Sequence, residues 1–288
     1  MTAIDNEHDD PERVNRFLVG LARGIAGALL FSIPMLMTME MWFLGFYMDR
    51  ERLLILLVVN LPLLLLLSHR IGFERTATWR ESARDAIVAY GMGVAASALI
   101  LFLFGVITLD MSPREWVGMV AIQAVPASIG ALLGRSQLSM KDDEDTDEEE
   151  DEPAVSSESG YVIELFMMAI GALFLSLNLA PTEEMILLAY KMTVWHALAL
   201  MLLSILLMHG FVYALAFRGG HHLDADTPLW HAFVRFTIPG YVIALAVSLY
   251  ALWTFGRLDD IAAAEAVLTI IVLGFPAAIG AAAARLVL

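Results

Sequence analysis

The sequence predicts an all-α fold: a polytopic membrane bundle of about eight transmembrane helices, arranged as two parallel four-helix repeats. Hydrophobic residues make up 59% of the 288-residue chain, and its mean hydropathy is +0.72. A soluble chain is usually about 45–50% apolar. Long apolar runs recur along the chain, and two stretches in the second half resemble two in the first. These three observations define the fold class.

Eight apolar runs are candidates to cross about 30 Å of hydrocarbon. Their approximate bounds are 17–38, 53–68, 86–108, 116–134, 161–181, 194–217, 230–254 and 262–284. We expect each to be a helix, because lipid leaves backbone polar groups no partner outside the segment. The alternating pattern of a membrane barrel is absent.

Two pairs of segments indicate an internal duplication. GALLFSIPMLMTMEMWFLGFYM (27–48) and GALFLSLNLAPTEEMILLAYKM (171–192) share nine identities in 22 positions without a gap. PASIGALLGR (126–135) matches PAAIGAAAAR (276–285), and the small residues in both suit close helix packing. An even number of helices in each copy makes the copies parallel.

The predicted domains are therefore a first membrane repeat at 1–140, a linker at 141–158 and a second membrane repeat at 159–288. The formal net charge of −15 comes mainly from the linker, where KDDEDTDEEEDE (141–152) contains ten acids. Without those ten, 22 acids face 17 Lys and Arg. We expect a disordered cytoplasmic tether, with binding of a divalent ion or a partner protein as the alternative.

Lys and Arg set the expected orientation. With eight crossings and a cytoplasmic N-terminus, twelve of them fall on the inside and five on the outside. This asymmetry favours an inner-membrane protein with both termini in the cytoplasm. The first ten residues are acidic and do not resemble a signal peptide.

The first helix of each repeat is expected to be broken. Residues 17–48 would form a straight helix of about 48 Å, which is too long for one crossing. Pro34 and Pro181 interrupt the two copies, so we expect the chain to unwind around 34–38 and 178–182. Each copy then restarts as a short helix, and Thr182 is the expected N-cap of the second. Pro126 and Pro276 are further candidates to break or kink their helices.

Hard oxygen ligands gather at the two expected breaks. They are Ser32, Thr38 and Glu40 in the first copy, and Asn178, Thr182, Glu183 and Glu184 in the second. Carboxylates are costly in hydrocarbon, and discontinuous helices bind ions in transporters. The leading hypothesis is a channel or secondary transporter for a small cation: a proton, sodium or a divalent ion. The same glutamates also fit helix ends at the membrane interface, beside an aromatic belt.

Further polar residues fall inside the spans. Asn60 and His209 are candidates to line the same pathway, where a histidine would suit a proton-coupled step. Interhelical hydrogen bonds explain them equally well, as they do Glu164 and Gln123.

Other functions make different demands on the sequence. A non-transporting scaffold or stress sensor would use the acidic linker to bind a partner, and a lipid-modifying enzyme would need a pair such as His209 with Glu184. No catalytic or nucleotide-binding motif is present, so we expect no enzyme activity and no cofactor. The chain has no cysteine for a thiolate metal site. The cluster 219–226 fits a metal site or a solvated turn, so the metal is unknown. The expected partners are the lipid bilayer and a small cation but not nucleic acid, and a homo-oligomer is compatible.

The NLAPTEEM stretch (178–185), on a chain of eight spans, resembles an uncharacterised family of bacterial integral membrane proteins. This resemblance implies a membrane location over most of the chain. It implies no activity.

Overall fold

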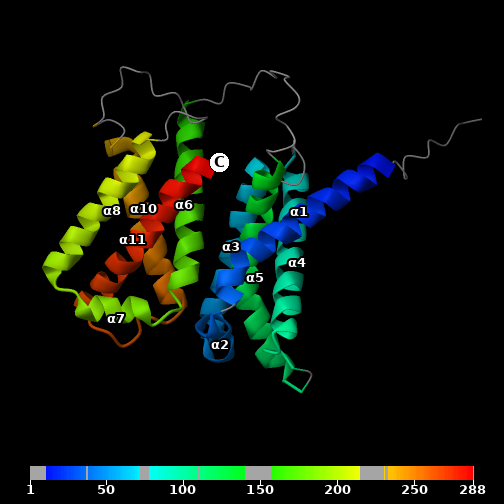
Figure 1. Ribbon diagram of the computed structural model, residues 1–288, viewed down its shortest axis with the longest axis horizontal. Coiled ribbons are helices and arrows are strands. Elements are labelled where there is room, and N and C mark those ends of the chain that lie inside the picture. The colour runs from blue at the N-terminus through cyan, green and yellow to red at the C-terminus, as the bar shows by residue number, and fades with distance from the viewer. Residues whose placement is uncertain are drawn as a thin grey trace, which may run out of the picture. The chain divides into compact units, whose positions relative to one another are not determined.

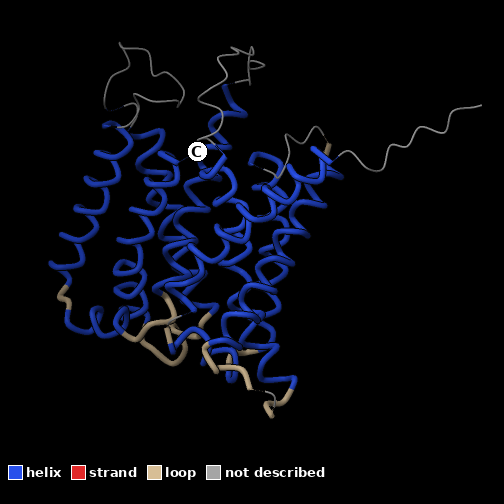
Figure 2. The backbone as a smooth tube through the Cα atoms, turned by 45° about the vertical axis from the view of Figure 1, so that its right-hand side comes forward, coloured by secondary structure: helices blue, strands red, loops and turns tan. Residues whose placement is uncertain are grey.

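The computed structural model describes residues 11–36, 38–71, 78–108, 110–139, 157–214, 230 and 233–287. Its contacts divide the chain into two compact units, residues 1–147 (unit 1) and 148–288 (unit 2). All regular structure in the described residues is helical (Figure 1, Figure 2). The acidic stretch 141–152 and the cluster 219–226 lie outside the described residues, so the expectations for them remain predictions.

The described part of unit 1 contains four long helices and one short one. In chain order they are α1 (Pro11–Leu36), α2 (Met39–Tyr47), α3 (Arg50–Ile71), α4 (Trp79–Leu103) and α5 (Pro113–Ser139). The α4 helix begins with a capping box, in which Thr78 accepts from the Glu81 N–H and the Glu81 side chain accepts from the Thr78 N–H. These bonds satisfy two of the free N–H groups at a helix start.

Unit 2 has the same order of long and short helices. They are α6 (Ser157–Leu179), α7 (Glu184–Lys191), α8 (Val194–Ala214), the π-helix η2 (Phe233–Thr237) continuing into α10 (Ile238–Thr254), and α11 (Ala263–Val287). The short α7 lies across one end of the unit, and α8 leaves it at an angle of 120° (Figure 1).

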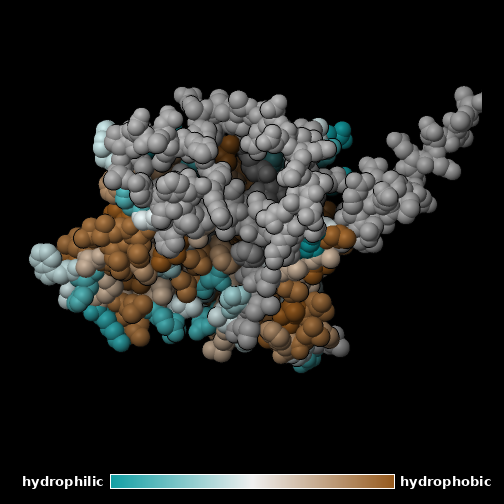
Figure 3. Space-filling view, turned by 45° about the horizontal axis from the view of Figure 1, so that its top comes forward, coloured by the Kyte–Doolittle hydropathy of each residue, from teal (hydrophilic) through white to brown (hydrophobic). Residues whose placement is uncertain are grey.

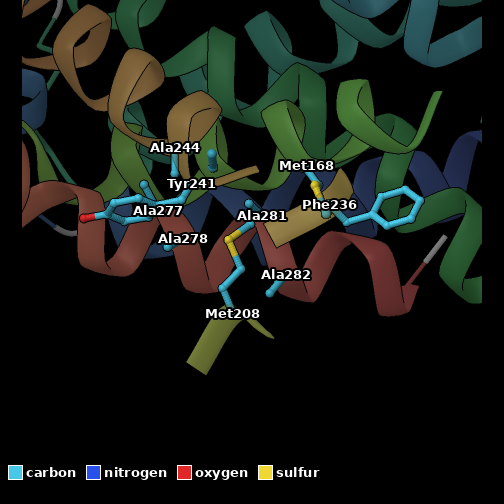
Figure 4. Close-up of a cluster of buried hydrophobic side chains, with 10 residues drawn as sticks. Met168, Met208, Phe236, Tyr241, Ala244, Ala277, Ala278, Ala281 and Ala282 are labelled. Carbon is cyan, nitrogen blue, oxygen red and sulfur yellow. The ribbon is translucent and has the colours of Figure 1, made fainter. Parts of the chain in front are cut away.

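The last helix of each unit is its centre. In unit 1, α5 contacts α1, α2, α3 and α4, and 89% of its most apolar stretch is buried, against 33% for α3. In unit 2, α11 contacts α6, α7, α8 and α10. Figure 4 shows the alanine face of α11, where Met208 of α8 and Tyr241 of α10 pack against it. The outer faces of both units carry large apolar side chains, seen as brown surface in Figure 3.

Glycines allow the first and last helices of each unit to cross closely. A Cβ added to Gly27 would lie 2.6 Å from the Gly134 Cα and would also meet the Gly130 carbonyl. A Cβ added to Gly171 would meet the Gly280 carbonyl in the same way. The expectation of close packing by small residues is confirmed at both crossings.

The described residues include six helices long and apolar enough to cross a membrane, or seven if α7 and α8 form one bent span. The prediction of a helical bundle with several membrane spans is confirmed, and the number of about eight stays a prediction. In α1 the described residues include a shorter apolar stretch, Val19–Leu29.

The expectation of helix breaks at Pro126 and Pro276 is wrong, because α5 and α11 continue through them. A proline removes one backbone hydrogen bond, and close packing around a central helix can offset that loss. Beside Pro126, the Ser128 hydroxyl donates to the Val125 carbonyl at 2.7 Å.

The helix ends reveal a third pair of matching segments. Residues 79–105 and 230–256 share nine identities in 27 positions, including Trp79 with Trp230 and Ser97 with Ser248. Each segment ends with Phe-Gly, and Gly105 and Gly256 have φ of 70° and 69°. These are the left-handed glycines that commonly end helices.

Candidate functional site

The α1–α2 break is closed by a threonine. Helix α1 ends at Leu36 and α2 begins at Met39. The Thr38 hydroxyl and N–H both donate to the Met35 carbonyl, at 2.8 and 3.1 Å. Glu40 stands half-buried in the first turn of α2, where the helix dipole favours a negative charge.

The α6–α7 break has the same construction. Helix α6 ends at Leu179, and the Thr182 hydroxyl and N–H donate to the Leu179 carbonyl at 2.9 and 3.1 Å. Thr182 is therefore not the N-cap of α7, as the sequence suggested: its hydroxyl closes the preceding helix, and Glu183 occupies the cap position. Glu183 and Glu184 are exposed.

Two other expected ligands bond within their own helices. Ser32 is fully buried and its hydroxyl donates to the Ala28 carbonyl at 2.6 Å. The Asn178 amide donates to the Phe174 carbonyl at 2.8 Å, although its Oδ1 is buried without a donor among the described residues.

Different side chains reach the carbonyls at the two breaks. In unit 1, the Gln123 Nε2 of α5 donates to the Met35 carbonyl at 3.2 Å. In unit 2, the Arg257 Nη2 donates to the Pro181 carbonyl. A neutral amide side chain therefore bonds to a carbonyl at one break, and a guanidinium group bonds to a carbonyl at the other.

Two buried amides define a polar centre in unit 1. Gln123 and Asn60 are 0% and 2% exposed. The Asn60 Nδ2 donates to the Ser128 Oγ at 3.0 Å, and Ser128 itself donates to Val125. Because a carbonyl can only accept, Gln123 must turn its NH₂ toward Met35, and the Ser128 bond likewise fixes Asn60. Among the described residues, neither Asn60 Oδ1 nor Gln123 Oε1 then has a donor.

Ser97 adds a third buried oxygen to this region. Its hydroxyl is buried without a partner among the described residues. Ser97 lies one turn along α4 from Gly93, whose added Cβ would meet Ser128 and the Ala124 carbonyl. The close approach at Gly93 brings α4 against the part of α5 that carries Ser128.

His209 lies apart from the glutamates in unit 2. Its Nδ1 is 3.0 Å from the Thr237 hydroxyl, and its ring meets Phe233 edge-on. Glu184 begins α7, whereas His209 is fifteen residues beyond the start of α8, about 22 Å along a helix. The geometry does not bring His209 and Glu184 together.

Two charged residues with notable positions were not among the candidates that the sequence suggested. Asp85 is 2% exposed in α4, 3.6 Å from the Arg84 Nε. It was overlooked because the expected span began at residue 86, whereas α4 begins at Trp79. Arg257 was assigned only to an external loop. The sequence signal for its position is Phe255-Gly256, which fixes where α10 ends.

The described residues contain no group of three or more His, Cys, Asp or Glu that could hold a metal ion. The polar centre of unit 1 instead offers uncharged oxygens.

The helices and their buried polar centre define a polytopic α-helical membrane protein. Residues 20–288 match the family described as "Putative integral membrane protein (DUF2391)", and the chain belongs to that family. The resemblance to an uncharacterised membrane family is thereby confirmed. No curated protein and no solved structure matches the chain.

Proposed function

We propose that the protein transports a proton or a monovalent cation across the inner membrane, along polar residues buried in unit 1. The observation that carries this proposal is the pair of side-chain oxygens on Asn60 and Gln123 that have no donor among the described residues. Burying an acceptor without a donor costs about 1–3 kcal/mol. Polar groups kept at this cost inside membrane bundles commonly line a substrate pathway.

The ligand chemistry favours a single positive charge. A cation, or a proton carried on water, would supply what the two carbonyl oxygens lack. Neutral oxygens in a low-dielectric interior compensate one charge more readily than two. The hypothesis from the sequence also allowed a divalent ion as the transported species, and the proposal leaves that ion out.

The order of residues along unit 1 gives the proposed path. Glu40 stands at the α1–α2 break, where the Met35 carbonyl is bonded by Gln123. Ser128 and its partner Asn60 follow five residues further along α5, about 7.5 Å away. Asp85, near the start of α4, is the proposed acid at the cytoplasmic end.

The proposed architecture is two parallel copies of one four-helix unit, with both termini in the cytoplasm. Three sets of features support duplication: matched breaks closed by Thr38 and Thr182, matched crossings at Gly27 and Gly171, and the matching segments 79–105 and 230–256.

The test grafts residues of unit 2 onto unit 1. The matching segments pair Ser128 with Ala278, and extending the offsets of the flanking segments, 144 and 150 residues, pairs Asn60 with Ser204 and Gln123 with Leu273. Each residue of unit 2 is already accommodated in a similar helix bundle. We expect Gln123→Leu, and separately Asn60→Ser, to lower H⁺, Na⁺ or K⁺ flux in proteoliposomes at least tenfold.

The matched control is Ser204→Ala, which should leave flux unchanged. Ser204 is buried in unit 2 at the position of Asn60, but its hydroxyl is satisfied by the Leu200 carbonyl at 2.7 Å. Wild-type flux that survives both grafts would reject the path. Absence of all three fluxes in the wild type, with loss of cellular function on deleting 141–152, would favour a scaffold or sensor instead.

A further inference from the structure

A positively charged side chain, that of Arg257, lies at the α6–α7 break. Arg257 lies between α10 and α11, and its Nη2 donates to the Pro181 carbonyl. Its Nε is buried and has no acceptor among the described residues. Arg257 is half-buried, and the Pro181 carbonyl holds its guanidinium group at the break.

The end of α10 fixes the position of Arg257. The Gly256 N–H donates to Trp253 at 3.0 Å and the Arg257 N–H donates to Leu252 at 2.8 Å. This pair of bonds, with the left-handed Gly256, is a Schellman helix end. The side chain thus projects from a defined point of the backbone.

Unit 1 has the same helix end but no charge there. The Gly105 N–H donates to Phe102 and the Val106 N–H to Leu101, both at 3.0 Å. The residue that corresponds to Arg257 is Val106. The α1–α2 break therefore has one acid, Glu40, and no arginine at the corresponding position, whereas the α6–α7 break has Arg257 together with two exposed acids, Glu183 and Glu184.

We propose that Arg257 determines the charge selectivity of the α6–α7 break and excludes other cations from it. A guanidinium bonded to the Pro181 carbonyl occupies the place where a free cation would bind, and its charge repels a second cation in a low-dielectric setting. The two breaks then have opposite preferences: the α1–α2 break accepts cations, and the α6–α7 break does not. This deepens the proposed function, on which it rests, by assigning the cation path to one break.

The absence of cysteine from the sequence allows a direct test of charge at each break. Thr38→Cys and Thr182→Cys place single thiols at corresponding half-buried positions. Each is labelled with two methanethiosulfonate reagents of similar size, one carrying trimethylammonium and one carrying sulfonate. Acids lie near both thiols, Glu40 near residue 38 and Glu183 and Glu184 next to residue 182, so the ratio of cationic to anionic labelling rates is compared within each Cys protein, with and without its arginine.

Arg257→Gln removes the charge and retains an N–H donor for the Pro181 carbonyl. In the Thr182→Cys protein, this change should raise the labelling ratio about tenfold, because Glu183 and Glu184 remain while the positive charge is removed. The reciprocal change, Val106→Arg in the Thr38→Cys protein, should lower the ratio there. Val106→Arg also provides a second route if Arg257→Gln fails to fold.

A labelling ratio in the Thr182→Cys protein that does not respond to Arg257→Gln would overturn the proposal. The labelling needs no ion flux, so the two proposals can fail separately. Labelling that follows Arg257 in a protein without flux would retain the charge assignment and reject transport. Flux that depends on Gln123, with no labelling response, would retain transport and reject the role of Arg257.

Discussion

Units 1 and 2 close their helix breaks with the same threonine bond but use different groups around it. Thr38 and Thr182 each donate twice to the carbonyl three residues earlier. Beside that shared feature, unit 1 presents a buried amide, Gln123, and unit 2 presents a guanidinium, Arg257. The common backbone geometry shows what the fold requires at a break, and the differing side chains show where function can diverge.

The central helices α5 and α11 show the same difference, because α5 carries polar residues where α11 carries apolar ones. Gln123 and Ser128 of α5 correspond to Leu273 and Ala278 of α11, and all four are buried. The α5 residues bring polar groups into the interior of unit 1, while their α11 counterparts pack with apolar neighbours. A fold that tolerates Leu273 does not need an amide at that position. We infer that Gln123 is retained for a reason other than folding.

The largest effect is expected at the glycine crossings. In Gly27→Ala the added Cβ meets backbone of α5, and in Gly171→Ala it meets the Gly280 carbonyl of α11. Because backbone cannot move aside as a side chain can, each change should cost about 3 kcal/mol or more. Thermal unfolding in detergent, followed by size-exclusion chromatography, measures both.

Gly91→Ala and Gly210→Ala are the matched controls, since nothing lies within 4 Å of a Cβ at either position. They should be neutral or slightly stabilising, because alanine is the better helix former. A loss at only one of the two crossings would show that the units pack differently in spite of their similar sequences.

The next largest effect is a change in the free energy of unfolding that has opposite signs in the two units. Gln123→Leu removes a buried oxygen that has no donor among the described residues, and the Met35 carbonyl keeps both bonds from Thr38. We expect a gain of about 1 kcal/mol in the free energy of unfolding. The reverse graft, Leu273→Gln, places an amide among apolar neighbours and should cost about 2 kcal/mol. The same unfolding assay reports both signs, and a loss for Gln123→Leu would mean that the amide serves stability.

How far the sequence predicted this arrangement depends on the kind of feature. Apolar runs placed most helices, because burial in lipid imposes long runs that are visible in composition. The positions of the breaks could be expected from Pro34, Pro181 and the repeated threonine and glutamate. The segments 79–105 and 230–256 also match, yet they were overlooked because their identities are scattered over more than seven helical turns.

The bonding partners could not be predicted from the sequence. Gln123 lies 88 residues from Met35, and Arg257 lies 76 residues from Pro181. Such pairs arise only when helices pack, since no local pattern specifies which side chain reaches a distant carbonyl. The same holds for Thr182, whose hydroxyl had two competing roles: capping the next helix or closing the previous one.

A smaller, equal effect is expected at the two helix ends that carry a left-handed glycine. Gly105→Ala and Gly256→Ala each place a Cβ at positive φ, which costs about 1 kcal/mol. Nothing lies within 4 Å of a Cβ at Gly105, so its cost is conformational alone. Equal shifts in unfolding temperature would support a common origin for these helix ends. Asp260→Gly is the opposite change at φ 58° and should stabilise by a few tenths of a kcal/mol.

The last prediction concerns the threonines that close the breaks. Thr38→Val and Thr182→Val each remove one hydroxyl bond, at a cost of about 0.5–1.5 kcal/mol. The Met35 carbonyl has a second side-chain donor in Gln123, so Thr38→Val should fall at the low end and Thr182→Val at the high end. Adding Gln123→Leu removes that second donor. The cost of Thr38→Val in this background should therefore rise toward that of Thr182→Val. A double-mutant cycle measures this coupling, and strict additivity would mean that Gln123 and Thr38 act independently at the break.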